Sequence, residues 1–316
     1  MNTRAICFSL LSIIAISITA SLPAQEQRAR VFVSVNGNDA NPCTALSPCK
    51  TFQAAHDAVL AGGEISVLDT GGYGTLVINK AISIVAIGVQ ASIAIPQFGT
   101  GITINANFTD SISLRGLILD GQGVIATNGI VFNTGLSLEV VDCVVRNMTG
   151  DGLDFIGNAT TTQQLAVSNS YFADNRANGV VIETSNSGTI GAAIDRTVFY
   201  GNRASGLLLQ GFEGTGGLFV AVTDSTAANS ANSGSSTVAG FQIVTGTTNG
   251  SFTNLSLTHC LIEGNIVGIG TAGSRGTVWL AQSTLTGNAA GFSIAVVPST
   301  ALATTTSPLM EATQEH

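Results

Sequence analysis

The chain has 316 residues, of which only 9% are charged, and its formal net charge is −8 at pH 7. With 11 Lys and Arg residues and a pI near 4.7, it lacks the clustered basic surface that nucleic acid needs, so nucleic acid is excluded as a partner. Hydroxyl and amide side chains, rather than ion pairs, must keep such a chain in solution.

Residues 1–24 predict a secretory signal peptide. Arg4 precedes an apolar run from Ala5 to Ala20, and small residues lead to a cleavage site after Ala24. An uncleaved membrane anchor is the alternative, but the run is short for a span of ~20 residues and contains serines. Later apolar segments are interrupted by Gly, Asn or Asp. We therefore expect an exported protein, periplasmic, cell-surface or extracellular, with no transmembrane segment in the mature chain.

Residues 25–63 predict a cap over the first end of the domain that follows. A strand is expected from Val31 to Val35 and a short helix from Thr51 to Leu60, ended by Gly62 and Gly63. A sheet domain with open strand edges needs such a cover.

Cys43 and Cys49 lie close together within this cap, in a chain that we expect to be exported. That context favours a disulfide between them. A zinc site is the alternative, but no partner pair of Cys or His stands nearby. His56 lies on the expected helix, where a solvated or capping role is favoured over catalysis.

Residues 64–297 contain an internal repeat. Residues 165–182 read LAVSNSYFADNRANGVVI, residues 192–209 read AAIDRTVFYGNRASGLLL, and the two copies stand 27 residues apart. A fixed period of this length, rich in strand-forming residues, predicts a solenoid in which each coil buries its apolar face on the next coil.

Side chains that are apolar, or small with a hydroxyl or thiol, recur at fixed positions of this repeat and are expected to face inward. The columns are Ile112, Leu138, Leu165, Ala192, Val220, Leu255 and Val278; Leu114, Val140, Val167, Ile194, Val222, Leu257 and Leu280; and Leu117, Cys143, Ser170, Thr197, Ser225, Cys260 and Ser283. A third strand adds pairs such as Leu153 with Phe155 and Phe292 with Ile294. Alternation by two with breaks between pairs predicts three short strands per coil, which is a parallel β-helix.

Asparagines recur near a bend, at Asn147, Asn175, Asn202, Asn265 and Asn288, and also at Asn229. Asn suits tight turns, and copies one coil apart would stand ~4.8 Å from each other. We expect a structural ladder of side-chain amides. Cys143 and Cys260 share an inward column four coils apart, about 19 Å, which is too far for a disulfide, so both should be buried free thiols.

The cap, which begins VFVSVNGNDANPCTALSPCKTFQAAHDAVL, and the repeats after it resemble bacterial right-handed parallel β-helix repeat proteins of the pectate-lyase-like superfamily over residues 31–297. The resemblance implies right-handed winding and a secreted or envelope location. The predicted fold is therefore all-β, a single-stranded right-handed parallel β-helix with an N-terminal cap containing a short helix. Residues 298–316 carry no repeat and predict a disordered tail.

The resemblance implies no reaction, because much of the family has none assigned. Asp120 to Gly123 resembles a segment of polygalacturonase-type glycosidases, but the other motifs of that group are absent. No calcium-type nonapeptide occurs, so we expect no metal and no cofactor. We expect a non-catalytic solenoid that binds extracellular or envelope polysaccharide or serves as an adhesive or structural module. A polysaccharide lyase, glycoside hydrolase or epimerase is the alternative.

Asp154, Glu183 and Asp151 are the candidate catalytic residues of that alternative. Asp154 and Glu183 should point outward from neighbouring coils, offset by two residues, with their Cα atoms about 8 Å apart. That spacing suits the carboxyl pair of an inverting glycosidase. A solvated acidic patch is the competing interpretation, because no Lys or Arg stands in the same column to hold an anionic sugar.

Two other features bear on a binding face. Trp279 follows the inward Val278 and should point outward, where an indole can stack on a sugar ring. Residues 230–239 form an insertion, and insertions in solenoids emerge as loops on one face. Its small polar residues favour a passive flexible loop.

Overall fold

The computed structural model describes residues 27–122, 125–211, 215–230, 238–246 and 250–295. The predicted signal peptide at 1–24, the predicted tail at 298–316 and most of the insertion at 230–239 lie outside these residues. Within them, no helix is both long enough and apolar enough to cross a membrane.

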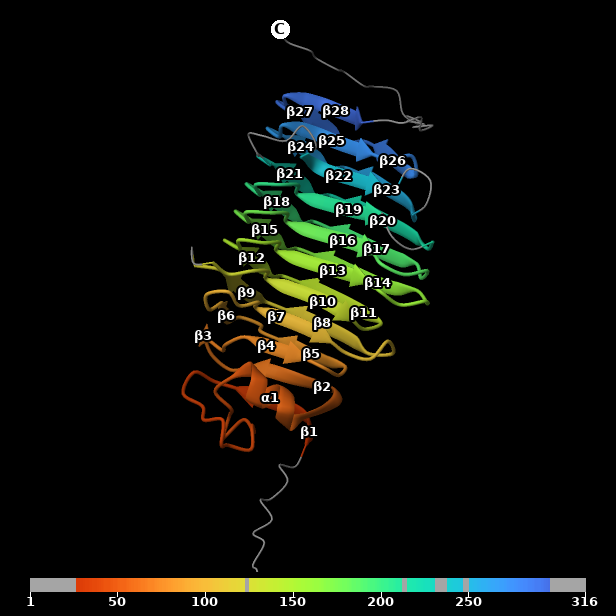
Figure 1. Ribbon diagram of the computed structural model, residues 1–316. Helices are drawn as coiled ribbons and strands as arrows, with labels where there is room; N and C mark the ends of the chain where they lie inside the picture. Colours follow the sequence, from red (N-terminus) through yellow and green to blue (C-terminus); the bar gives the residue numbers. More distant parts are fainter. Residues whose placement is uncertain (1–26, 123–124, 212–214, 231–237, 247–249, 296–316) are drawn as a thin grey trace, which may run out of the picture.

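The chain winds into a solenoid whose wall consists of three parallel sheets (Figure 1). The first sheet contains β1 (Arg28–Val33), β2 (Val59–Val67), β5 (Ile82–Val85), β8 (Ser111–Arg115), β11 (Ser137–Val141), β14 (Gln163–Ser168), β17 (Ile190–Asp195), β20 (Gly217–Thr223), β23 (Phe252–Thr258) and β26 (Gly276–Ala281). The second contains β3 (Gly71–Gly72), β6 (Ala91–Ala94), β9 (Leu117–Asp120), β12 (Val144–Arg146), β15 (Tyr171–Ala173), β18 (Val198–Tyr200), β21 (Thr226–Ala228), β24 (Leu261–Glu263) and β27 (Thr284–Thr286). The third contains β4 (Leu76–Ile78), β7 (Ile102–Asn105), β10 (Ile130–Thr134), β13 (Leu153–Gly157), β16 (Val180–Thr184), β19 (Leu207–Gly211), β22 (Ala239–Thr245), β25 (Val267–Ala272) and β28 (Ala290–Ala295). The predicted all-β parallel β-helix is confirmed.

The inward columns follow from the two-residue period of a strand. Leu114 pairs with Val140, Val140 with Val167, and Val167 with Ile194, and all four side chains are buried. Each coil therefore covers the apolar side chains of the previous one, and the core runs as one continuous cluster along the axis. The register predicted from the repeats is the register of the structure.

The corner between the first and second sheets is held by a left-handed residue in each coil. The residue before the Ser170 position has a positive φ in every copy: from 44° at Arg196 to 55° at Asp142 in the six copies where it is polar, and 75° at Gly116. The next side chain supports the bend: the Ser170 hydroxyl donates to the Ser168 carbonyl at 2.8 Å and accepts from the backbone N–H of Cys143 at 3.1 Å. Cys143 and Cys260 occupy this same inward column as buried free thiols, as predicted.

The asparagine ladder is interrupted. Asn175 donates its side-chain amide to Asn202 Oδ1 at 2.9 Å, and Asn265 donates to Asn288 Oδ1 at 3.0 Å. Asn147 is not part of the ladder: it stands one position earlier, at the left-handed bend with a φ of 61°, and its side chain donates to Asp120. It lies four residues after the Cys143 column position, whereas Asn175 lies five after Ser170.

The coil between the two asparagine pairs has serine instead of asparagine at the ladder position. Asn229 also has the left-handed bend geometry, with a φ of 56°, so Ser230 takes the ladder position in that coil. The Ser230 backbone N–H donates to Asn265 Oδ1 at 2.9 Å.

The cap combines a disulfide with one short helix. Cys43 and Cys49 are bonded to each other and buried. The helix α1 (Phe52–Ala58) begins after Thr51, whose hydroxyl accepts from the Ala54 N–H, and is shorter than predicted. Gly62 and Gly63 do not end it, because Val59 already has extended geometry and begins β2, which runs across the predicted cap boundary at residue 63.

His56 is buried rather than solvated. Its side chain is 2% exposed, its Nε2 accepts from the Asn79 backbone N–H at 3.4 Å, and burial lowers its pKa. His56 thus fastens the cap helix to the first coil.

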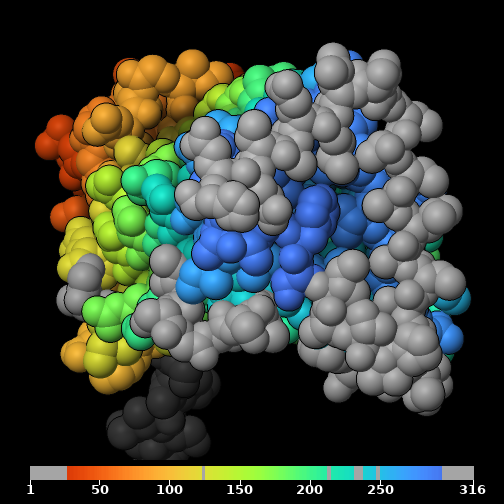
Figure 2. All heavy atoms as spheres, turned by 90° about the horizontal axis from the view of Figure 1, so that it is seen from above, coloured from red at the N-terminus to blue at the C-terminus, as the bar shows by residue number. Residues whose placement is uncertain are grey.

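The opposite end of the solenoid is less covered. Val278, Leu280 and Leu285 are only partly buried, and Phe292, an inward position by sequence, is 52% exposed. Seen along the axis from this end, the last coils face the viewer (Figure 2). No described strand pairs with the outer edges of β26, β27 and β28.

Candidate functional site

The outer face of the first sheet is hollowed by a groove of about 850 Å³. Its lining extends from Ser83 on β5 to Trp279 on β26. That run crosses seven steps between neighbouring strands of the sheet, which at ~4.8 Å each makes about 34 Å. A groove of this length follows the solenoid axis and suits a polymer better than a single sugar.

The floor of the groove comes from one outward position that repeats in every coil. Reading from β5 to β26, this column is Ser83, Ser113, Glu139, Ala166, Ala193, Ala221, Ser256 and Trp279. Three consecutive alanines keep the side chains short in the middle of the groove floor, and Gly191 beside Ala193 adds no side chain. Larger side chains stand at both ends of the column, so the alanines form the lowest part of the groove.

Uncharged polar side chains stand along both the floor and the walls of the groove, among apolar ones. The Ser137 hydroxyl donates to Ser111 at 2.8 Å, and the Ser113 hydroxyl donates to Glu139 at 2.7 Å. Others in the lining are Thr162, Gln164, Asn254 and Ser256. Hydroxyl and amide groups both donate and accept hydrogen bonds, as sugar hydroxyls do. Glu139 is the one ionisable side chain among the described lining residues.

Two exposed aromatic side chains stand at the β26 end of the groove. Trp279 points outward, as predicted, and is 44% exposed, while Phe219 is 48% exposed. Phe219 was not predicted as a site residue, although it lies between the inward Leu218 and Val220 and the two-residue period alone would place it outward. Exposed rings of this kind can stack on the faces of sugar rings.

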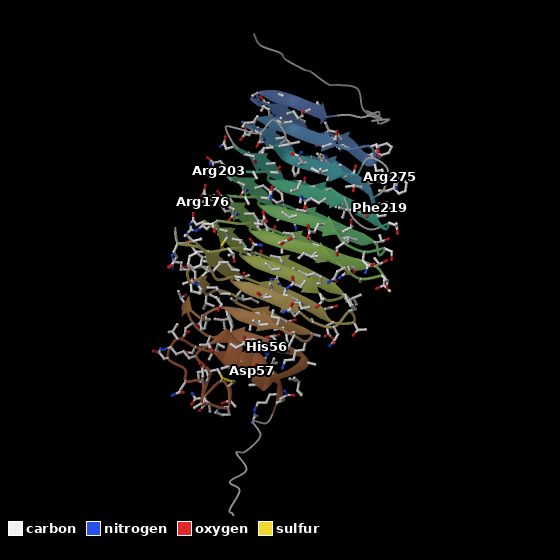
Figure 3. All side chains as sticks on the ribbon, viewed as in Figure 1. His56, Asp57, Arg176, Arg203, Phe219 and Arg275 are labelled. Atoms are coloured by element: carbon white, nitrogen blue, oxygen red, sulfur yellow. A yellow bond between two sulfur atoms is a disulfide. The ribbon has the colours of Figure 1, made fainter. Side chains whose placement is uncertain are left out.

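Arg275 and Phe252 lie beside this end of the groove. The Arg275 guanidinium stands 4.5 Å from the centroid of the Phe252 ring and donates to the Gly250 carbonyl at 3.0 Å. Figure 3 shows Arg275 and Phe219 on the same side of the solenoid, in its C-terminal half. The charge of Arg275 is thus engaged by an aromatic face and a carbonyl.

The predicted acids come together on a different face, the outside of the third sheet. Asp154 pairs with Val181 and Glu183 pairs with Ile156, which is the offset of one coil and two residues that the repeats predicted. Val131 precedes Asp154 in the same outward column. Asp154 therefore stands between two valines on neighbouring strands.

This apolar setting controls the protonation of the cluster. Burial, then the charges of Glu183 and Asp151, raise the pKa of Asp154 to about 7. Asp151 accepts two hydrogen bonds from Asn178, each 2.8 Å long, but burial outweighs them and raises its pKa. A carboxyl that keeps its proton near neutral pH can act as a general acid.

The groove and the acidic cluster do not meet. Asp151, Asp154 and Glu183 are absent from the lining of the groove, which lies on the first sheet. Among the described residues, no group of three His, Cys, Asp or Glu side chains is arranged to hold a metal ion. Asp120 is held at a turn by Gln122, Arg146 and Asn147, as a structural residue would be.

No protein-family model matches the sequence, and no curated protein matches it either. The comparison with solved structures did find similar chains. A crystal structure of pectate lyase Pel9A aligns with a TM-score of 0.57 and 17% identity, covering 87% of this chain and 78% of that one. An alginate lyase from Paenibacillus sp. str. FPU-7 aligns with a TM-score of 0.46 and 13% identity over 77% of this chain and 94% of that one. A rhamnogalacturonan lyase aligns with a TM-score of 0.41 and 13% identity over 76% and 82%. The predicted pectate-lyase-like β-helix fold is confirmed, and at these identities the likeness is one of fold alone.

Proposed function

We propose that this protein is an exported β-solenoid that binds a polysaccharide along the groove of the first sheet and does not cleave it. The observation that carries the proposal is the groove itself, about 34 Å long at ~4.8 Å per strand, with an alanine floor, some hydroxyl and amide groups in its walls and two aromatic side chains at one end. Export is supported by the Cys43–Cys49 disulfide and by the predicted signal peptide at residues 1–24.

Each part of the groove corresponds to a feature of a glycan chain. The exposed faces of Trp279 and Phe219 suit the C–H faces of sugar rings. The hydroxyl and amide groups of Ser113, Gln164 and Asn254 suit sugar hydroxyls. Cleavage by paired carboxyl groups is disfavoured, because Glu139 is the single acid among the described lining residues and such catalysis needs a second carboxyl group.

The test compares Trp279→Ala with Tyr200→Ala. Both residues carry exposed aromatic rings, 44% and 42% exposed, but Tyr200 lies on the second sheet away from the groove. Electrophoresis of the mature protein through gels containing polysaccharides would measure binding, and release of reducing ends would measure cleavage. We expect wild type and Tyr200→Ala to be retarded, Trp279→Ala to lose about tenfold in affinity, and no reducing ends to form.

A second candidate function is favoured by one specific observation, the raised pKa of Asp154, about 7. In this alternative the protein is a polysaccharide lyase or glycoside hydrolase, with Asp154 donating a proton and Glu183 or Asp151 acting as the partner carboxylate. Steady turnover by wild type that Asp154→Asn and Glu183→Gln each abolish, while Trp279→Ala retains it, would replace the binding proposal with this one.

A further inference from the structure

We infer that the polymer held in the groove is an uncharged polysaccharide. This inference rests on the proposed function and adds the substrate class. The starting observation is that, among the described residues lining about 34 Å of groove at ~4.8 Å per strand, the one ionisable side chain is an acid, Glu139, and none is Lys or Arg. A polyanionic glycan would therefore meet no counter-charge along the groove and one like charge.

The arginines at the edges of the first sheet are already engaged. The Arg115 Nε atom stands 3.2 Å from Asp142, and an Arg196 guanidinium nitrogen stands 2.6 Å from Asp195. Arg275 covers the ring of Phe252. These contacts offset the charge of each cation, and none of the three arginines is among the described residues that line the groove, so the groove offers no ready-made site for an acidic sugar.

The groove does provide what a neutral glycan needs. The three-alanine floor accepts the apolar face of a sugar chain, and the hydroxyls of Ser111, Ser113 and Ser137 stand beside it. Hydrogen bonding of this kind does not depend on long-range charge, whereas the net charge of −8 repels polyanions before contact. Shape, hydroxyls and charge therefore favour the same ligand class.

The experiment is affinity electrophoresis of the mature full-length protein with four probes. Dextran and hydroxyethyl cellulose are the neutral polymers, polygalacturonate and alginate the anionic ones. We expect retardation by at least one neutral polymer and by neither anionic one. Neutral binding should change less than about twofold between about 0.01 M and about 1 M NaCl, where the Debye length falls from about 30 Å to about 3 Å.

A pair of charge-reversed variants tests the reason for the selectivity. Glu139→Lys places a cation in the groove, and we expect it to gain measurable binding to polygalacturonate that weakens as salt rises. Glu263→Lys makes the same change in net charge at an exposed site on β24 of the second sheet and should gain none. Equal gains by both variants would mean that net charge, not the groove, governs polyanion binding, and would overturn the inference.

The outcomes for wild type separate this inference from the proposed function. Tighter binding to polygalacturonate or alginate than to either neutral polymer, lost in Trp279→Ala, would overturn the uncharged class but leave polysaccharide binding in place. Binding to none of the four polymers would overturn both.

Discussion

The outer faces of the first and third sheets are built from the same kind of strand, yet they differ in chemistry. On the first sheet the outward column runs through Ala166, Ala193 and Ala221, which leaves an open groove with uncharged walls. On the third sheet the equivalent outward column has Asp154 between Val131 and Val181, and Val181 is only 4% exposed. One face carries a long groove, and the other carries a carboxyl group whose pKa is raised.

The difference shows that the regular stacking of strands in a solenoid determines the spacing of outward side chains but not their chemistry. Both faces repeat at ~4.8 Å along the axis, so any outward side chain meets its counterparts on the coils before and after it. Small residues repeated at one position make a hollow. Apolar residues repeated around a carboxyl remove it from water and raise its pKa.

The largest expected effect is on stability, through the asparagine ladder inside the solenoid, which supports both faces. Asn202 is fully buried, accepts from the Asn175 backbone and side chain at 3.2 and 2.9 Å, and donates to the Phe172 carbonyl at 2.9 Å. Asn202→Ala should lower the free energy of unfolding by about 3 kcal/mol, because three bonds are lost and buried partners are left unpaired.

The control for this ladder prediction is Asn288→Ala. Asn288 is only partly buried in the last described coil, where water can replace its bonds, so we expect a loss of about 1 kcal/mol. Urea midpoints measure both variants. Equal losses would show that the buried ladder adds nothing beyond ordinary turn bonds.

The second effect is a pH dependence of stability that arises from Asp154 on the third sheet. The pKa of Asp154 in the folded state, about 7, exceeds its reference value of 3.8. The folded chain therefore holds the proton more tightly, so the stability that this group contributes is fully present below about pH 4 and is lost as pH rises to about 7. Because water still reaches the side chain, we expect about 2 kcal/mol for this loss.

Asp154→Asn should remove this slope and be the more stable protein at about pH 8, as urea unfolding at about pH 4 and about pH 8 would measure. Glu139→Gln, a change of the same type in the groove, is the matched control and should follow the wild-type slope. A slope that persists in Asp154→Asn would assign the proton to another group.

The third effect isolates the groove. Ala193 is exposed at the centre of the alanine floor, so Ala193→Phe fills the hollow without disturbing the core. Polysaccharide affinity should fall by about tenfold or more, equivalent to about 1.4 kcal/mol. Thr284→Phe places the same ring on an exposed position of the second sheet and should bind like wild type. Undiminished binding by Ala193→Phe would place the ligand elsewhere.

The smallest effect concerns one wall of that groove. Phe219→Ala should weaken polysaccharide binding about threefold, about 0.7 kcal/mol, which is within the range of one aromatic contact. Phe252→Ala is the control, because that ring lies outside the groove lining and Arg275 already covers it. Isothermal titration would separate the two. A larger loss for Phe252→Ala would extend the binding surface beyond the groove lining to the Phe252 ring.

Several expectations needed the structure to correct them, and each concerned a contact between distant residues. Ser205 stands in a polar turn, yet it is 3% exposed because Gln242 and Ala239 of the next coil lie beside its hydroxyl. His56 is buried because Asn79 of the first coil lies against the cap helix. Neither neighbour can be read from the residues around Ser205 or His56.

The sequence by itself determined the fold, the coil register and the buried columns, because the two-residue side-chain period and the repeat can both be read along the chain. It also predicted the Cys43–Cys49 pair, because the two cysteines lie close together in a chain expected to be exported. It also placed Asp154, Glu183 and Trp279 on the outside. Only the tertiary structure decided that Trp279 ends a groove and that Asp154 holds its proton to about pH 7. The depth of a hollow and the dielectric around a carboxyl depend on the volumes of side chains from several coils at once. Those side chains are brought together only when the coils stack.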